Sequence, residues 1–103
     1  MKTLCASKDG EYIVRIAGDI DHHSSTGVRE DIDEALINLR PKRLILDLSE
    51  TDFMDSSGLG LILGRLRKTA EMGIGFVLVN PTEAILKILR LAGVEKMLEI
   101  RIL

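Results

Sequence analysis

Aromatic residues are scarce in this chain of 103 residues: they make up 3% of it, and tryptophan is absent. The hydrophobic core must therefore be aliphatic, and an aromatic stacking surface for single-stranded nucleic acid is not expected. The one cysteine, Cys5, excludes an internal disulfide and a zinc site built from several cysteines. A single thiol fits a reducing compartment, so we expect a cytoplasmic protein.

The chain also lacks an excess of positive charge, because 14 basic and 16 acidic residues give a formal net charge of −2. This balance disfavours binding to the phosphate backbone of nucleic acids and to anionic membrane surfaces. Long hydrophobic runs are missing as well, and the first residues lack the apolar segment of a signal peptide. We therefore expect neither nucleic acid nor a membrane among the partners.

The residues that are present are typical of one globular domain spanning 1–103, with 46% hydrophobic and 29% charged residues. Short apolar runs bounded by glycine, proline or charged residues predict five strands, the first two joined by a turn at Gly10. The predicted strands are 3–7, 12–17, 43–48, 74–79 and 97–103.

Apolar residues at helical spacing predict three helices between these strands. The helices are expected from Ser25 or Thr26 to Pro41, from the end of a loop at 49–55 to Gly73, and from a cap at Asn80, followed by Pro81, to Gly93. The faces expected toward the core are Val28, Ile32, Ala35, Leu36 and Leu39 in the first helix, and Leu59, Ile62, Leu63, Leu66 and Ala70 in the second. Arg65 is expected toward the C-terminal end of its helix, where a cation complements the helix dipole.

The order of elements, β-β-α-β-α-β-α-β, predicts an α/β fold: a mixed sheet of about five strands with about three helices packed on it. Functional sites in such folds lie at the carboxyl ends of the strands. Segments 19–25 and 51–58 both follow predicted strands. We therefore expect the two segments to meet at this edge of the sheet.

The segment FMDSSGLG at 53–60 is the most informative in the chain, because it joins a strand to a helix. A purely structural role is possible, since aspartate and serine are preferred helix caps and glycine permits close packing. A serine hydroxyl at a helix start also suits reversible phosphorylation, which adds roughly two negative charges beside free backbone N–H groups. The segment therefore supports two interpretations, a cap and a switch.

A serine nucleophile is a weaker interpretation of the same segment. Ser56 or Ser57 would need a positioned base, and the only histidines, His22 and His23, lie in the other segment. The strained elbow of serine hydrolases is also missing from the sequence. No catalytic residue is therefore predicted.

Cofactor and metal sites are also weakly supported. Gly58, Gly60 and Gly64 resemble part of a dinucleotide-binding loop, but the rest of that fingerprint is missing. The acids and histidines of 19–23 offer metal ligands, although adjacent histidines rarely face one ion and no second cluster supports them. We expect neither a cofactor nor a metal.

Three stretches together carry a family resemblance: GDIDHHSS at 18–25, FMDSSGLGLILGR at 53–65 and LRLAGVEKMLEI at 89–100. The chain resembles the anti-sigma factor antagonists of the STAS domain family over almost its whole length. The GDIDHH stretch makes it most similar to the sporulation anti-sigma-F antagonist type. In that family a C-terminal helix commonly follows the last strand, whereas this chain ends at Leu103.

The resemblance implies a switch protein that is not an enzyme. Its unphosphorylated form would bind an anti-sigma factor that is also a serine kinase, and so release the sigma factor. The kinase would phosphorylate Ser56, flanked by Asp55, Ser57 and Gly58, and a PP2C-type serine phosphatase would reverse the reaction. The acidic side chains near Ser56 would form a docking edge for a basic patch on the kinase. The residues expected to contact the partner are Asp19, Asp21, His22, His23, Ser24, Asp52 and Met54.

Two alternatives within the same family remain open at this point. One is an interaction module in a stress-response or stressosome-like scaffold, which would co-purify as a large homotypic assembly. The other is a STAS module that binds a small molecule, which would raise its thermal stability.

Overall fold

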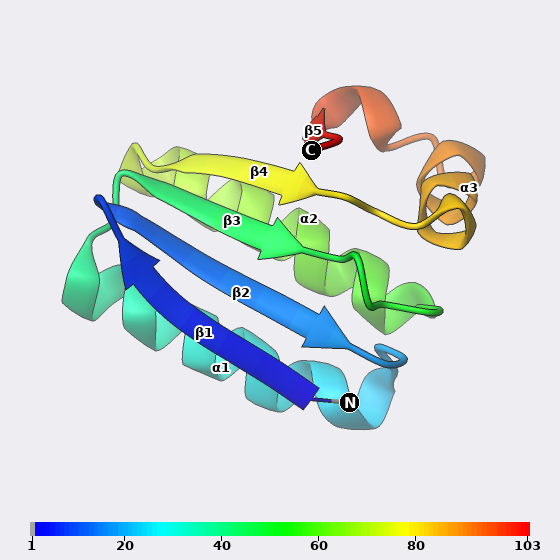
Figure 1. Ribbon diagram of the computed structural model, residues 1–103, viewed down its shortest axis with the longest axis horizontal. Helices are drawn as coiled ribbons and strands as arrows, with labels where there is room; N and C mark the ends of the chain where they lie inside the picture. Colours follow the sequence, from blue (N-terminus) through cyan, green and yellow to red (C-terminus); the bar gives the residue numbers. More distant parts are fainter. Residues whose placement is uncertain (1) are drawn as a thin grey trace.

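The computed structural model describes residues 2–103 and contains one five-stranded sheet with three α-helices (Figure 1). The strands are β1 (Lys2–Lys8), β2 (Glu11–Ala17), β3 (Arg43–Asp47), β4 (Gly75–Val79) and β5 (Glu99–Arg101). The helices are α1 (His22–Leu39), α2 (Ser56–Met72) and α3 (Glu83–Leu91), followed by the short 3-10 helix η1 (Glu95–Met97). The predicted α/β class and order of elements are confirmed.

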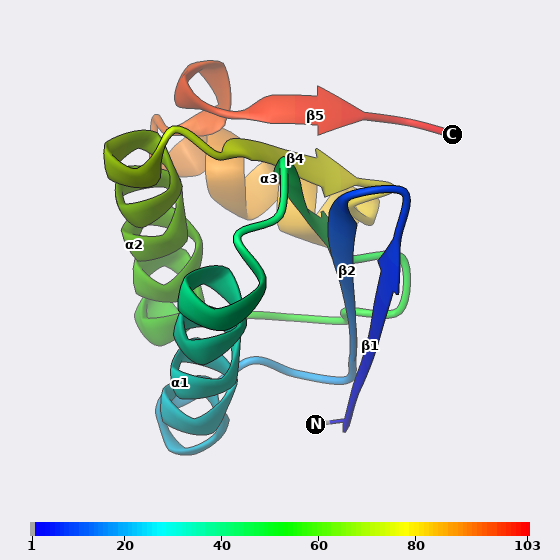
Figure 2. The ribbon, with the colours of Figure 1, turned by 90° about the vertical axis from the view of Figure 1, so that its left-hand side faces the viewer.

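The sheet has the order β1-β2-β3-β4-β5, with β1 antiparallel to β2 and the remaining neighbours parallel. The mixed sheet predicted from the opening hairpin is therefore present. Helices α1 and α2 lie side by side against one face of the sheet (Figure 2). This arrangement brings the starts of both helices to the edge where β2 and β3 end.

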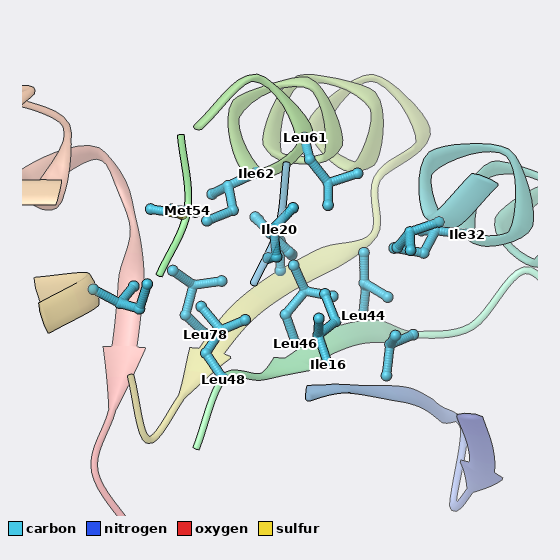
Figure 3. Close-up of a cluster of buried hydrophobic side chains, with 14 of the residues drawn as sticks. Ile16, Ile20, Ile32, Leu44, Leu46, Leu48, Met54, Leu61, Ile62 and Leu78 are labelled. Carbon is cyan, nitrogen blue, oxygen red and sulfur yellow. The ribbon is translucent and has the colours of Figure 1, made fainter. Parts of the chain in front are cut away.

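The core lies between the sheet and these helices, and it is almost entirely aliphatic, with Phe76 as its one aromatic member in the described residues, as the scarcity of aromatic residues predicts (Figure 3). Alternate side chains of the central strands point into it, as expected when one face of a strand is buried. Burying each such side chain contributes about 1.5–3 kcal/mol. The strands contribute Val14, Ile16, Leu44, Leu46, Phe76 and Leu78, and the helices contribute Val28, Ile32, Leu36, Leu61, Ile62, Ile85 and Leu89.

Helix α1 starts earlier than the sequence predicts. Asp21 is its N-cap: the carboxylate accepts a hydrogen bond from the Ser24 backbone N–H at 2.8 Å, and the Ser24 hydroxyl accepts one from the Asp21 N–H at 3.1 Å. This reciprocal capping places His22 and His23 in the first turn of the helix and not in a loop. At the other end Leu39 is exposed, so the predicted core face ends at Leu36.

The predicted core face of α2 is confirmed in part: Ile62 is buried and Leu59 and Leu66 pack half-buried against the core, but the most buried side of the helix lies about one position away. The observed buried residues are Gly58, Leu61, Ile62, Arg65 and Thr69. Ala70 is exposed, and of the predicted set only Ile62 is fully buried. Arg65 is buried because it pairs with Asp33 of α1, with 2.9 Å between Nε and Oδ1.

Helix α3 also begins at a different cap, since Thr82 and not Asn80 accepts the hydrogen bond from a backbone N–H of the first turn. Asn80 adopts a left-handed conformation with φ 51°, which ends β4 before the helix begins. Gly73 caps the end of α2 with φ 70°, as predicted. In residues 2–103, none of the helices has the length and apolar character needed to cross a bilayer.

Candidate functional site

Two segments that are far apart in sequence form the candidate site, and backbone hydrogen bonds join them. The Gly18 N–H donates to the Glu50 carbonyl, and the Ile20 N–H donates to the Phe53 carbonyl, both at 2.9 Å. The Asp55 N–H donates back to the Ile20 carbonyl at 3.2 Å. The loops after β2 and β3 are therefore paired main chain to main chain, and the expectation that they meet at one edge is confirmed.

Buried side chains of the two paired loops attach them to β2 and to the hydrophobic core. Thr51 is fully buried, and its hydroxyl donates to the Ile16 carbonyl at 2.7 Å. Ile20 and Met54 pair in a parallel bridge and lie in the core (Figure 3). The expectation that Met54 contacts a partner is wrong, because its side chain is 1% exposed and belongs to the floor of the site.

The first turn of helix α2 packs directly against Met54. Asp55 is its N-cap, and one carboxylate oxygen accepts hydrogen bonds from the Ser57 and Gly58 N–H groups at 2.8 and 3.3 Å. A Cβ atom on Gly58 would lie 2.5 Å from the Met54 Cβ, so no larger residue fits there without a shift of the backbone. The cap and the glycine together place Ser56 at the first position of the helix.

The two serines of the motif differ in their surroundings. Ser56 is exposed, and its side chain makes no hydrogen bond within residues 2–103. Ser57 is half-buried, and its hydroxyl lies 3.4 Å from Nδ1 of His22 at the start of α1. The free hydroxyl at this edge is therefore that of Ser56.

The contact between His22 and Ser57 is one that sequence reasoning missed, because it placed the histidines in a separate loop. It brings a base to a hydroxyl, but within the described chain no third group holds the imidazole in place, as nucleophilic catalysis requires. Likewise, no three histidine, cysteine or acidic side chains among residues 2–103 come together as metal ligands. The hydroxyl of Ser56 is thus exposed at this site without a hydrogen bond from residues 2–103.

Four acidic side chains lie in the two paired segments, and the expectation that they form a docking edge for a partner stays a prediction. Asp19, Asp21 and Asp52 are exposed, and Asp55 is half-buried. Hydrogen bonds from the backbone and side chain of Ser24 lower the pKa of Asp21. Asp21 and Asp55 are both engaged as caps, so Asp19 and Asp52 are the acids whose carboxylates point to no partner in the described chain.

Phe53 is an additional surface residue that sequence analysis passed over. Its side chain is 54% exposed, although it lies between Asp52 and the buried Met54. His23 is also exposed, in the first turn of α1, whereas the Ser24 hydroxyl is used in the capping of α1. An exposed aromatic ring three residues before Ser56 is a feature that the apolar pattern of this segment did not predict.

Comparison with known families identifies this arrangement, because the STAS domain model matches residues 5–102. The chain belongs to the STAS domain family. Within the family it groups with the anti-sigma factor antagonists, which are regulatory proteins and not enzymes. This STAS domain is 36% identical over 91 residues to the anti-sigma F factor antagonist of Paenibacillus polymyxa, covering 88% of this chain and 78% of that protein.

Other relatives and solved structures agree with this assignment. The STAS domain is 28% identical over 92 residues to the anti-sigma-B factor antagonist of Bacillus subtilis, which covers 89% of this chain and 83% of that protein. The anti-sigma factor antagonist SpoIIAA in its unphosphorylated form aligns with a TM-score of 0.84 and 26% identity, over 97% of this chain and 88% of that one. The Bacillus SpoIIAA in its phosphorylated form aligns with a TM-score of 0.77, also with 26% identity, over 97% and 91% of the two chains.

Proposed function

We propose that this STAS domain is a phosphorylation-controlled antagonist of an anti-sigma factor that is itself a serine kinase, acting in the cytoplasm. The unphosphorylated form binds the kinase and releases the sigma factor, and phosphorylation of Ser56 ends this binding. A PP2C-type serine phosphatase restores the active form. The proposal follows the SpoIIAA structures, which are described in unphosphorylated and phosphorylated forms.

The observation that carries the proposal is the difference between the two serines. Ser56 is exposed with a free hydroxyl, whereas the Ser57 hydroxyl lies against His22 and the residue is half-buried. Of the two motif serines, Ser56 therefore presents the freer hydroxyl to a kinase that approaches this edge. The protein needs no base of its own, because the kinase supplies the base, the metal and ATP.

Electrostatics explains how a phosphate would switch binding off. The start of α2 tolerates the added charge, because the N-terminal end of a helix is positive. A basic patch on the partner would be attracted by the added charge, so loss of binding must come from repulsion between the phosphate and neighbouring carboxylates and from the cost of desolvating the phosphate in the interface. A tenfold loss of affinity needs only about 1.4 kcal/mol, so one phosphate is sufficient.

The experiment is phosphorylation by the anti-sigma factor kinase of the same organism with ATP, followed by mapping of the phosphosite by mass spectrometry. We expect phosphate on Ser56 in the wild-type chain and in Ser57→Ala, and none in Ser56→Ala. We also expect Ser56→Asp to bind the kinase more than about tenfold less tightly in calorimetry. Phosphate that persists in Ser56→Ala would disprove the assignment of the acceptor.

A second candidate function is a module of a stress-response scaffold. Size-exclusion chromatography of the protein purified from its own organism separates the two candidates. A large homotypic assembly supports the scaffold, and a small complex with one kinase supports the switch.

A further inference from the structure

A groove of about 250 Å³ lies between the first turns of α1 and α2, next to the paired loops. Its walls come from one face of each helix, at positions three or four residues apart. The groove is lined by His22, Ser25, Thr26 and Arg29 of α1 and by Ser57, Gly60 and Leu61 of α2. Because Ser57 forms part of the wall, a protein docked over Ser56 would also cover this groove.

The lining is rich in hydrogen-bond donors and contains no carboxylate. Three hydroxyl groups, one imidazole and one guanidinium face the space. The nearest capping acids, Asp21 and Asp55, direct their carboxylates to N–H groups of their own helices. The groove therefore differs in charge from the acidic loops beside it.

Arg29 supplies a positive charge that the described part of the chain leaves unpaired. It makes no ion pair within 4.0 Å, and the carboxylate one turn along α1, that of Asp33, is bound by Arg65. Burial lowers the pKa of Arg65, Asp33 opposes this effect, and the nearby charge of Arg29 lowers it further. Asp33 thus pairs with Arg65 alone, which leaves the positive charge of Arg29 beside the groove without a carboxylate partner in the described chain.

Gly60 leaves space in the wall of the groove, and packing within the chain does not require a glycine there. A Cβ atom at this position would meet no other atom within 4 Å, whereas at Gly58, half a turn earlier, it would collide with Met54. Glycine inside a helix costs up to about 1 kcal/mol relative to alanine. The open space at Gly60 is therefore not explained by the packing of the chain itself.

We infer that the groove receives an acidic side chain of the protein that docks on the Ser56 surface, with Arg29, His22 and the Ser57 hydroxyl as its donors. The donors suit a carboxylate, and the groove is continuous with the proposed docking surface. An acidic rim and a basic groove side by side would also fix the orientation of the partner. The identity of the partner rests on the proposed function, but the affinity of the groove for carboxylate does not.

The first test measures the groove alone. The ¹⁵N-labelled full chain is titrated with sodium acetate at constant ionic strength, and the amide signals of Ser57 and Gly60 are followed by NMR. We expect saturable shifts that Arg29→Ala abolishes. Arg67→Ala is the matched control, because Arg67 is highly exposed and lies outside the groove.

The second test measures the partner. Gly60→Gln places a side chain in the groove, and Gly64→Gln is its control, because a Cβ atom at Gly64 also meets nothing within 4 Å and lies outside the lining. We expect Gly60→Gln and Arg29→Ala to weaken binding to the anti-sigma factor kinase about tenfold or more in calorimetry. Gly64→Gln and Arg67→Ala should bind like the wild-type chain.

The outcomes separate the groove from the proposed function. Saturable acetate shifts together with weakened kinase binding by both groove variants support the inference. Acetate shifts with unchanged kinase affinity overturn it, because they show an anion site that the partner does not use, and absence of both effects overturns it as well. If the wild-type chain fails to bind the kinase, the proposed function fails too, and the acetate titration still reports whether the groove accepts a carboxylate.

Discussion

At the scale of the residue, Gly58 is the position where the site tolerates least change. Its missing side chain lets the start of α2 rest on Met54, and an added Cβ atom would lie 2.5 Å from the Met54 Cβ. We predict that Gly58→Ala lowers the free energy of unfolding by about 1–3 kcal/mol, because overpacking forces neighbours to move. Chemical denaturation measures the change.

The control for this prediction is Gly64→Ala in the same helix, where a Cβ atom meets nothing within 4 Å. Here alanine should raise the free energy of unfolding by about 0.5–1 kcal/mol, because it restricts the unfolded chain and favours the helix. Equal effects of the two substitutions would show that contact with Met54 does not set the requirement for glycine.

At the scale of the element, one ion pair joins α1 to α2. The Arg65 side chain is 8% exposed, and its Nε lies 2.9 Å from Oδ1 of Asp33. This contact is an ion pair by distance without hydrogen-bond geometry, since Nε and Nη1 of Arg65 and Oδ1 of Asp33 all lack a hydrogen-bond partner in the described chain. We predict that Asp33→Ala lowers the free energy of unfolding by about 3 kcal/mol, because it leaves a buried charge unpaired. Denaturant unfolding of the single variant tests this.

The double variant Asp33→Leu with Arg65→Met is the decisive comparison. Replacing both charges with apolar residues of similar volume is often neutral or stabilising. We expect it to recover most of the stability lost in Asp33→Ala. A double variant as unstable as the single one would mean that the pair itself, and not the avoidance of a lone charge, holds the helices together.

A second ion pair joins two strands: Nε of Arg15 in β2 lies 3.1 Å from Oδ2 of Asp47 in β3. Its contribution to stability should depend on pH. Burial alone would raise the pKa of Asp47, but hydrogen bonds from Ser49 and Arg15 outweigh it and hold the pKa below its ordinary value. Because the pKa of Asp47 is lower in the folded state than in the unfolded state, ionised Asp47 stabilises the fold at pH values above the unfolded-state pKa of about 4. This contribution is lost as the pH falls through the lower pKa of the folded state.

We therefore predict that Asp47→Asn is less stable than the wild-type chain at pH 6 and that the difference shrinks at pH 3. Urea unfolding at both values measures it. Asp52→Asn is the control, because Asp52 is exposed and its side chain makes no hydrogen bond within residues 2–103. A difference that stays constant between the two pH values would contradict the assigned role of ionised Asp47.

The elements themselves were predictable from sequence, but several of their ends were not. Apolar periodicity reports which segments bury a face, so the order of strands and helices follows from it. The choice of cap between Asp21 and Ser25, or between Asn80 and Thr82, depends on how the preceding loop runs. That loop geometry is set by long-range pairing, such as the bridge of Ile20 to Met54.

The candidate site was predictable to a similar degree. Segments that follow neighbouring parallel strands must meet at one edge, so the approach of the two loops could be foreseen. The burial of Met54 and Arg65 could not, because each depends on a partner distant in sequence. The groove between α1 and α2 was equally hidden, since it arises from the relative placement of two helices.

At the scale of the whole molecule, modification of Ser56 should change binding without changing the fold. The chain aligns with both the phosphorylated and the unphosphorylated SpoIIAA structures over 97% of its length. We predict that Ser56→Glu keeps the melting temperature of the wild-type chain or raises it slightly, because a negative charge near a helix start contributes about 0.3–1 kcal/mol. Circular dichroism measures melting.

The control is the affinity of the same Ser56→Glu sample for the anti-sigma factor kinase, which we expect to fall. A large drop in melting temperature would instead mean that added charge acts by unfolding the start of α2. The two measurements together separate a change of surface charge from a change of structure.

The pairing of the two loops through their main chains has an evolutionary consequence. Main-chain peptide groups, and not exposed side chains, join these loops. Exposed positions such as Asp19, Asp52 and Phe53 can therefore be substituted one at a time without breaking the hydrogen bonds between the loops. Duplicated copies within one cell could thus diverge toward different kinases by surface substitutions alone. Parallel signalling pathways could then be kept separate without any change of fold.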